Sequence, residues 1–218
     1  MILKLFIVLF VIVNSVSSCV QKAEKMKTVT KVEPVSLEPL PGEAVATFAS
    51  GCFWCVEEIY ESVMGVREVI SGYAGGKAED ANYDAVSNGL TDHAETAQVY
   101  YDPKVITFED LTTAFFAGHD PTTLNRQGPD VGRQYRSIAF YRNEAEKEII
   151  LNKIDEINQS GEFKNPIVTE VVPFTAFYPA ESYHQDYILR NPNEPYVRGV
   201  SIPRYEEFKK KYKGKMKN

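Results

Sequence analysis

The sequence predicts an α+β fold with a ferredoxin-like split βαβ core, in which helices pack on a mixed sheet and a helical extension follows at the C-terminus. Two observations support this prediction. Strand-like and helix-like segments follow one another in the order β-α-β-β-α-β, with no internal repeat among them. The chain has 218 residues, of which 44% are hydrophobic and 25% charged, and this is enough for one domain with a buried core.

The first half of the domain contains three predicted strands and one helix. The run 44–49 alternates like a strand, and a helix with an apolar face follows to about Val63, where Gly65 is a natural stop. Residues 66–73 are rich in β-forming side chains and predict a second strand, and 94–101 predicts a third. The stretch between these last two strands is rich in Gly, Asp and Asn, so we expect a long loop there.

The second half begins with a helix signal. Thr107, followed by Asp110 three residues later, has the pattern of an N-cap and predicts a helix at 108–117. An irregular loop is expected next. The segment 135–142 then alternates apolar and polar side chains, which predicts the fourth strand.

The C-terminal part is predicted to be mainly helical. Asn143 and Gly161 have the chemistry of an N-cap and a helix stop, and the segment between them carries an apolar stripe. A fifth strand is expected at 167–172. A helix at 180–189 and a charged terminal helix at 203–213 complete the prediction.

The first 18 residues have the pattern of a secretory signal peptide. Lys4 precedes an apolar run at 5–13 that is too short to span a bilayer comfortably as a helix. The run leads to Val16-Ser17-Ser18-Cys19, which resembles the lipobox of bacterial lipoproteins, in which the peptide is cut before the Cys and the Cys is acylated. This predicts a lipoprotein-type signal peptide at 1–18 and lipidation of Cys19. A plain secreted protein and an uncleaved anchor with an incidental Cys are the alternatives.

The next segment, 19–41, contains Lys, Glu, Pro, Thr and Val with little apolar periodicity, and we expect a flexible tether. An edge strand at 27–32 is the alternative. The folded domain then covers 42–218 and ends in a basic tail. We therefore expect an exported protein of the bacterial cell envelope, lipid-anchored to a membrane on the periplasmic or outer surface. A net charge of −6 and an isoelectric point near 5.2 argue against nucleic acid as a partner.

Two cysteines, Cys52 and Cys55, lie at the predicted turn from the first strand into the first helix. Unpaired N–H groups and the positive end of the helix dipole occur at such a turn, so we expect Cys52 to ionise more readily than a free cysteine. A C-x-x-C pair is typical of half a zinc site, of a thioredoxin-type redox pair, or of a nucleophile with a resolving thiol one helical turn later. The chain has no second Cys pair and its three His are scattered, which disfavours zinc. A redox pair is favoured over a static disulfide, because closing so short a loop adds little stability.

The sequence around these thiols resembles the A-class peptide methionine sulfoxide reductases, and the likeness extends from about Val45 to Glu181. The matching segments occur in the family's order and at its spacing: Gly51-Cys52-Phe53-Trp54, Val56-Glu57, Gly72-Tyr73-Ala74-Gly75-Gly76, Asn82-Tyr83, His93-Ala94-Glu95, Tyr101-Asp102-Pro103, His119-Asp120-Pro121 and Gln134-Tyr135-Arg136-Ser137. This enzyme class reverses the oxidation of methionine. The resemblance implies reduction of methionine-S-sulfoxide, free or in proteins, as a repair reaction under oxidative stress.

The resemblance also implies roles for individual residues. Cys52 is the nucleophile that attacks the sulfoxide sulfur, and Glu95 is the proton donor to the oxygen, because a carboxyl in an apolar pocket keeps its proton near neutral pH. Tyr83 and Tyr135 hold the oxygen by hydrogen bonds, and Asp130 helps to fix this network. The structural alternatives are a solvated Glu95, core tyrosines and an Asp130 that only caps a turn.

Three further positions near the thiols have expected roles. Phe53 and Trp54 are expected to form an apolar wall for the substrate methyl group. His93 invites a Cys–His dyad, which we place second to the acid and the tyrosines. Glu57 is expected to be a surface or structural carboxylate.

Cys55 departs from the commoner family pattern, which has Gly at this position, and this chain also lacks the resolving cysteines that many members carry in a C-terminal tail. Cys55 is therefore the thiol expected to resolve the sulfenic acid of Cys52 as an intramolecular disulfide. An external thioredoxin-like dithiol would then reduce this disulfide, with no bound cofactor and no metal. We expect a monomer. A general thiol–disulfide oxidoreductase, and a non-catalytic module that binds methionine around a static disulfide, are the rival interpretations.

Overall fold

The computed structural model describes residues 37–217 of the chain. The predicted signal peptide, the lipidated Cys19 and the tether as far as residue 36 lie outside the described residues. Tyr100 donates a hydrogen bond from its hydroxyl to the Leu37 carbonyl, so the last residues of the predicted tether contact the domain. In the part of the chain that is described, no helix combines the length and the hydropathy needed to cross a bilayer.

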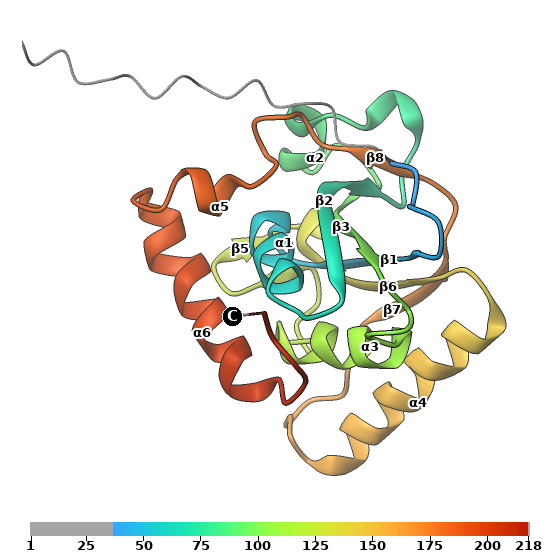
Figure 1. Ribbon diagram of the computed structural model, residues 1–218. Coiled ribbons are helices and arrows are strands. Elements are labelled where there is room, and N and C mark those ends of the chain that lie inside the picture. The colour runs from blue at the N-terminus through green and yellow to red at the C-terminus, as the bar shows by residue number, and fades with distance from the viewer. Residues whose placement is uncertain (1–36, 218) are drawn as a thin grey trace, which may run out of the picture. The chain divides into compact units, whose positions relative to one another are not determined.

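Six strands form one mixed sheet in the order β7-β6-β1-β3-β2-β8 (Figure 1). Their bounds are β1 Ala44–Ser50, β2 Val66–Ala74, β3 Ala94–Tyr101, β6 Ser137–Tyr141, β7 Glu170–Pro173 and β8 Phe177–Pro179. Only β6 and β7 are parallel within this sheet; the other neighbours are antiparallel. Because β3 lies between β1 and β2, the β1–α1–β2 unit is split, which confirms the predicted ferredoxin-like core.

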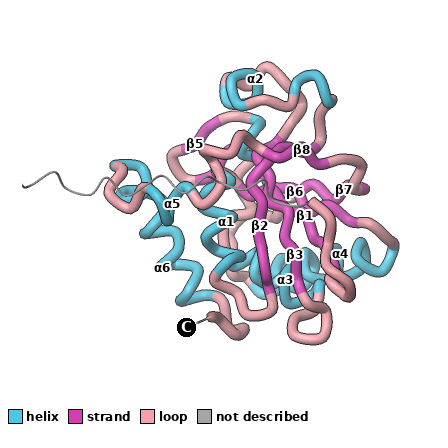
Figure 2. The backbone as a smooth tube through the Cα atoms, turned by 45° about the horizontal axis from the view of Figure 1, so that its top comes forward, coloured by secondary structure: helices cyan, strands magenta, loops and turns pink. Residues whose placement is uncertain are grey.

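Helices pack on this sheet (Figure 2), and the main hydrophobic core is built from side chains of both the strands and the helices. The longer ones are α1 Phe53–Glu61, α3 Phe108–Ala117, α4 Glu144–Ser160 and α6 Ile202–Lys211. The shorter ones are η1 Ala78–Asp80, α2 Tyr83–Ser87, η2 Arg133–Tyr135, α5 Tyr187–Arg190 and the π-helical η3 Val197–Ser201. Helix α1 packs on β2 and β3, α3 on β1, and α6 against α1. At the centre of the core the ring of Phe48 stacks on Tyr60, Phe108 and Phe115.

The predicted helix signals are confirmed where the chemistry is local. Thr107 and Asp110 form a complete capping box at α3, with each side chain accepting from the other's backbone N–H. The Asn143 side chain accepts from Glu146 N–H at the start of α4. Gly161 ends α4 with a φ of 73°, the left-handed conformation that glycine adopts without steric cost.

The predicted helix at 180–189 is wrong over most of its length, because turns occupy 182–186 and only α5 is helical. Hydrogen bonds to the core, made by a side chain of this segment and by one of its N–H groups, hold it in turns. Gln185 Oε1 accepts a hydrogen bond from Ser71 N–H, and Gln185 Nε2 donates to the carbonyls of Ser71 and Ala180. Asp186 has a φ of 51° and donates its N–H to the Glu57 carboxylate. These contacts, made across the fold, replace the i to i−4 bonds of a helix.

Other elements appear where the sequence predicted loops. Helix α2, capped by the Asn82 side chain, lies in the expected loop between β2 and β3. The irregular segment after α3 contains a small two-stranded sheet of β4 Arg126–Gln127 and β5 Asp130–Val131. Strand β8, which the sequence did not predict, pairs with β2 and forms one edge of the sheet.

Candidate active site

The turn from β1 into α1 carries the first functional residues, as predicted. Gly51 has a φ of +94°, and a Cβ at this position would lie 2.5 Å from Gln127 Cβ. Only glycine therefore fits, both for its conformation and for the close approach of Gln127 on β4. Cys52 follows as the N-cap residue of α1.

The register of the sheet brings Glu95 to this turn. Strand β1 pairs with β3 so that Phe48 lies opposite Ala97, which places Glu95 beside the end of β1. The Glu95 side chain is only 2% exposed, and its Oε2 accepts a hydrogen bond of 3.1 Å from Phe53 N–H. Burial raises the pKa of Glu95 to about 8, against the smaller opposing effect of this hydrogen bond. The carboxyl therefore keeps its proton at neutral pH, as the sequence predicted.

A cavity of about 320 Å³ lies against these residues. Its wall consists of Cys52, Phe53, Trp54, Tyr83, Glu95, Asp130, Tyr135, Tyr187, Glu194 and Tyr196. The structure thus brings together every residue that was expected to bind substrate or to transfer a proton. Cys55 does not line the cavity; it is buried, and its Sγ donates a hydrogen bond to Ser201 Oγ at 3.3 Å.

Two phenols face the cavity without a protein partner. Tyr83 is fixed at the start of α2, where its N–H donates to the Glu181 carboxylate at 3.0 Å, and Tyr135 ends η2. Burial raises the pKa of Tyr83 to about 12, and it also raises the pKa of Tyr135 above its usual value. Within residues 37–217 neither hydroxyl has a hydrogen-bond partner in the protein. Both are therefore neutral donors that are free to bind a ligand oxygen.

Aromatic rings form the apolar wall. Trp54 stacks face to face on Tyr187, with ring centroids 3.8 Å apart, and Phe53 lies beside it. The Trp54 Nε1–H donates to His184 Nδ1 at 3.1 Å, which fixes the indole in place. Burial lowers the pKa of His184 to about 4, so the imidazole is neutral. The wall can therefore pack against an apolar group without carrying a charge.

Sequence reasoning missed Tyr187, Glu194 and Tyr196. The Tyr196 hydroxyl donates to Asp130 Oδ2 at 2.5 Å and is also hydrogen bonded to Cys52. No local pattern marks these three residues, because they reach the site through the fold of the segment after β8. Pro192, just after the end of α5, is a signal in the sequence that the chain changes direction there.

The ionisation of the two thiols differs from the expectation. Both are free. Burial raises the pKa of Cys52 well above its usual value, and the neighbouring Cys55 and Glu95 add to this effect, so the helix terminus does not make Cys52 a resting thiolate. Cys55 has its pKa lowered to about 6, first by its hydrogen bond with Cys52 and then by the charge of Arg204 and the hydroxyl of Ser201.

The contacts of His93 and Glu57 show which roles these two residues can have. His93 is absent from the cavity wall and bonds through Nε2 to the Lys77 carbonyl, so no Cys–His dyad forms. Glu57 is a buried structural carboxylate that accepts from Ser71 Oγ and Asp186 N–H, and burial raises its pKa to about 8. In the described part of the chain, the one cluster with metal-ligand spacing is Glu57, Glu61 and Asp186, which includes neither thiol. The zinc interpretation therefore has no site at the cysteines.

Several known proteins are similar to this chain in sequence and in fold. The sequence profile of the family described as peptide methionine sulfoxide reductase matches residues 44–217. Peptide methionine sulfoxide reductase MsrA 1 of Rhodopirellula baltica is 47% identical over 185 residues, covering 85% of this chain and 95% of that protein.

Two solved structures show the same likeness. The reduced form of Mxr1 from Saccharomyces cerevisiae is 38% identical with a TM-score of 0.67, covering 72% of this chain and 91% of that one. Methionine sulfoxide reductase A of Corynebacterium diphtheriae is 31% identical with a TM-score of 0.64, covering 71% and 78%. The chain therefore belongs to the peptide methionine sulfoxide reductases, a family of oxidoreductases.

Proposed function

We propose that the cavity reduces methionine-S-sulfoxide, free or in oxidised proteins, to methionine. One observation carries the proposal: a buried thiol, a protonated carboxyl and two unpartnered phenols converge on one cavity with an aromatic wall. A general thiol–disulfide exchange would need only the cysteines and gives no reason for this convergence. Family membership supports the same activity, and the preference for the S epimer follows from the A-class relatives.

The first step is attack on sulfur. Cys52, as a thiolate, attacks the sulfoxide sulfur while Glu95 gives its proton to the oxygen. The attack forms a bond between the two sulfurs. The hydroxyl then passes from the methionine sulfur to the Cys52 sulfur as the sulfur–sulfur bond breaks, which releases methionine and leaves Cys52 as a sulfenic acid. The methionine sulfur gains two electrons and the cysteine sulfur loses two. Glu95 suits this task because its raised pKa keeps it in the acid form at neutral pH.

The other cavity residues position the substrate. Tyr83 and Tyr135 donate to the sulfoxide oxygen, and their donation strengthens as negative charge develops there. Phe53 and Trp54 contact the methyl group and the sulfur. Asp130 holds the Tyr196 hydroxyl next to Cys52. We propose that the enzyme is a monomer.

The second step regenerates the thiol. Cys55 attacks the sulfenic sulfur of Cys52, water leaves, and an intramolecular disulfide forms. Cys55 lies in the first turn of α1, three residues after Cys52, and the two buried thiols influence each other's pKa in the reduced protein. A thioredoxin-like dithiol then reduces the disulfide, and no bound cofactor takes part.

Two variants test this scheme. Cys52→Ser should abolish methionine release, and retained activity would refute the nucleophile. Cys55→Ser should release about one methionine per enzyme and then stop when thioredoxin is the reductant. Sustained turnover of Cys55→Ser with thioredoxin would refute the resolving role.

We also propose that the enzyme is exported and held at a bacterial membrane by lipid on Cys19, after cleavage of residues 1–18, with 19–41 as the tether to the reductase domain 42–218. The apolar run 5–13 and the small residues before Cys19 support this. Intact-mass analysis of the mature protein should show acyl chains on an N-terminal Cys19, and Cys19→Ser should leave the membrane fraction. An unmodified Cys19 in protein purified from membranes would contradict the anchor.

A further inference from the structure

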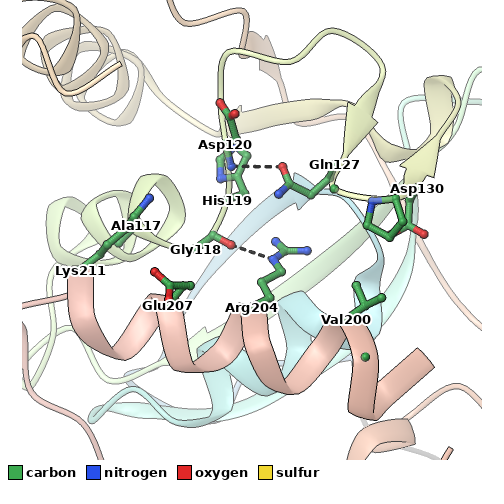
Figure 3. Close-up of a pocket in the computed structure, with 13 residues that line it drawn as sticks. Ala117, Gly118, His119, Asp120, Gln127, Asp130, Val200, Arg204, Glu207 and Lys211 are labelled. Carbon is green, nitrogen blue, oxygen red and sulfur yellow. Dashed lines mark hydrogen bonds between the residues drawn. The ribbon is translucent and has the colours of Figure 1, made fainter. Parts of the chain in front are cut away.

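A second cavity, of about 550 Å³, lies beside the substrate cavity and is the larger of the two (Figure 3). Its walls are the end of α3 with the loop that follows, the β4–β5 hairpin, the end of η3 and one face of α6. Figure 3 shows Arg204, Glu207 and Lys211 rising from the same side of α6 into this cavity. We call it the α6 groove. Of the residues that line it, the proposed reaction uses Asp130 alone.

The α6 groove has a buried floor and an exposed rim. Gly118 and His119 are buried, whereas Gly128 on the hairpin and Gly199 on η3 are exposed. A Cβ built on either Gly128 or Gly199 would have no atom within 4 Å, so the space in front of both is open. A cavity that is open along its rim suits an extended chain laid in from solvent better than it suits an enclosed small molecule.

The floor of the groove holds a fixed cation. Arg204, in the first turn of α6, donates from Nε to the Gly118 carbonyl at 2.8 Å and from Nη2 to the Ser50 carbonyl at 2.7 Å. Within residues 37–217 no hydrogen bond engages its third nitrogen, Nη1, which carries two further N–H donors. A Cβ on Gly51 would lie 3.3 Å from this nitrogen, so Nη1 is at the end of the groove next to the catalytic turn. A main-chain carbonyl, which Arg204 already binds twice, is the group that a peptide would present to it.

The α6 groove meets the substrate cavity at the β4–β5 hairpin. Asp130, the first residue of β5, lines both cavities. Gln127, at the other end of the hairpin turn, lines the groove and packs against Gly51, the residue before the nucleophile. The turn therefore lies between the two cavities. A polypeptide that leaves the substrate cavity past Asp130 enters the groove.

The length of the groove can be compared with that of a peptide. Its wall on α6 extends from Arg204 to Lys211, seven residue steps along the helix, or about 10 Å at 1.5 Å per residue. An extended peptide advances about 3.3 Å per residue. The groove therefore has the length of about three extended residues.

We propose that the α6 groove binds the polypeptide that continues from the methionine sulfoxide of an oxidised protein, over about three residues and on one side of the sulfoxide only. This inference rests on the proposed function and deepens it, because it makes a sulfoxide within a polypeptide a better substrate than an isolated one. The binding is one-sided because the two cavities share a wall at a single residue, Asp130. Contacts this far from the reacting sulfur are the same in the bound substrate and in the transition state, so they lower KM and leave kcat unchanged.

Steady-state kinetics with three sulfoxide substrates test the groove. The first is N-acetylated and amidated methionine-S-sulfoxide, and the others extend it by three alanines on the N-terminal or on the C-terminal side. One of the two extended peptides should have a KM about tenfold lower than the unextended substrate at equal kcat, the gain that one or two net hydrogen bonds supply. Equal KM values for all three substrates, or an equal gain from both extensions, would overturn the proposal.

Two variants place a ring in the groove from different walls. Gly199→Phe and Glu207→Phe both change exposed residues of the groove. Each should raise the KM of the favoured peptide about tenfold, to that of the unextended substrate. The KM and kcat of the unextended substrate should stay within about twofold of wild type, because it does not reach the groove. Arg198→Phe and Glu206→Phe are the matched controls: they add the same ring at exposed neighbours outside both cavities and should change the kinetics of neither substrate.

A favoured peptide that keeps its low KM in either Gly199→Phe or Glu207→Phe, with the unfolding midpoint of wild type, would also overturn the proposal. Failure of the proposed function would look different. In that case wild type would release no methionine from the unextended substrate, or Cys52→Ser would remain active.

Discussion

The protonated state of Glu95 can be tested by replacing it with glutamine. Glutamine has nearly the same shape and can still accept the hydrogen bond from Phe53 N–H, but it cannot give up a proton to the sulfoxide oxygen. With a pKa of about 8, about nine-tenths of the Glu95 carboxyls carry the proton at pH 7. At the usual pKa of a glutamate only about one in 300 would do so. We expect Glu95→Gln to lower kcat about 100-fold or more.

The same substitution should also remove a pH dependence from the free energy of unfolding. The unfolded chain loses the Glu95 proton near pH 4.5, whereas the folded protein holds it to about pH 8, so the folded state binds more protons between these values. The stability of wild type relative to Glu95→Gln therefore falls as pH rises through this window and is constant above it. At about 1.4 kcal/mol per pKa unit, the relative loss between pH 5 and pH 8 is about 3 kcal/mol.

Glu57→Gln is the matched control. Glu57 is also buried, its pKa is also about 8, and it lies outside the cavity. Urea unfolding at pH 5 and pH 8 should show a similar relief of pH dependence in both variants, while only Glu95→Gln loses activity. A Glu95→Gln enzyme that keeps wild-type kcat, or whose stability follows wild type between pH 5 and pH 8, would refute the reasoning.

Three further variants probe the rest of the cavity by steady-state kinetics with a methionine sulfoxide substrate. Tyr83→Phe and Tyr135→Phe each remove one donor to the oxygen and should lower kcat about 10- to 100-fold, with unchanged unfolding midpoints; equal activity in the double variant would exclude both phenols from catalysis. Trp54→Leu removes the indole that stacks on Tyr187 and bonds to His184, so KM should rise several-fold; a KM within twofold of wild type would show that the wall does not bind substrate.

The parts of the fold that were predictable from the sequence depend on local chemistry. The capping box of Thr107 and Asp110 and the stop at Gly161 involve neighbours in the chain, and the structure has them as expected. The sequence could not predict hydrogen bonds between residues that are far apart in the chain. The segment 182–186 forms turns instead of the predicted helix, because its Gln185 side chain bonds to the backbone of Ser71 and Ala180 and its Asp186 N–H donates to the distant Glu57 carboxylate.

The candidate site divides in the same way. Cys52, Glu95 and the phenols belong to recognisable motifs, and the structure gathers them around one cavity. Tyr196 belongs to no motif and reaches the cavity only through the path of the C-terminal segment. The sequence also predicted the wrong ionisation for Cys52, because the effect of a helix terminus can be inferred from local pattern, whereas the larger effect of burial depends on the whole fold.

The pairing of the two cysteines is tested most directly by mapping their oxidation after one turnover. Reduced enzyme is mixed with one equivalent of methionine sulfoxide, quenched with an alkylating agent and digested, and the peptide that contains both thiols is weighed. We expect one methionine per enzyme and a peptide about two mass units lighter than the reduced form, with Cys52 and Cys55 joined and unalkylated. Methionine released while both cysteines remain open to alkylation would contradict the account.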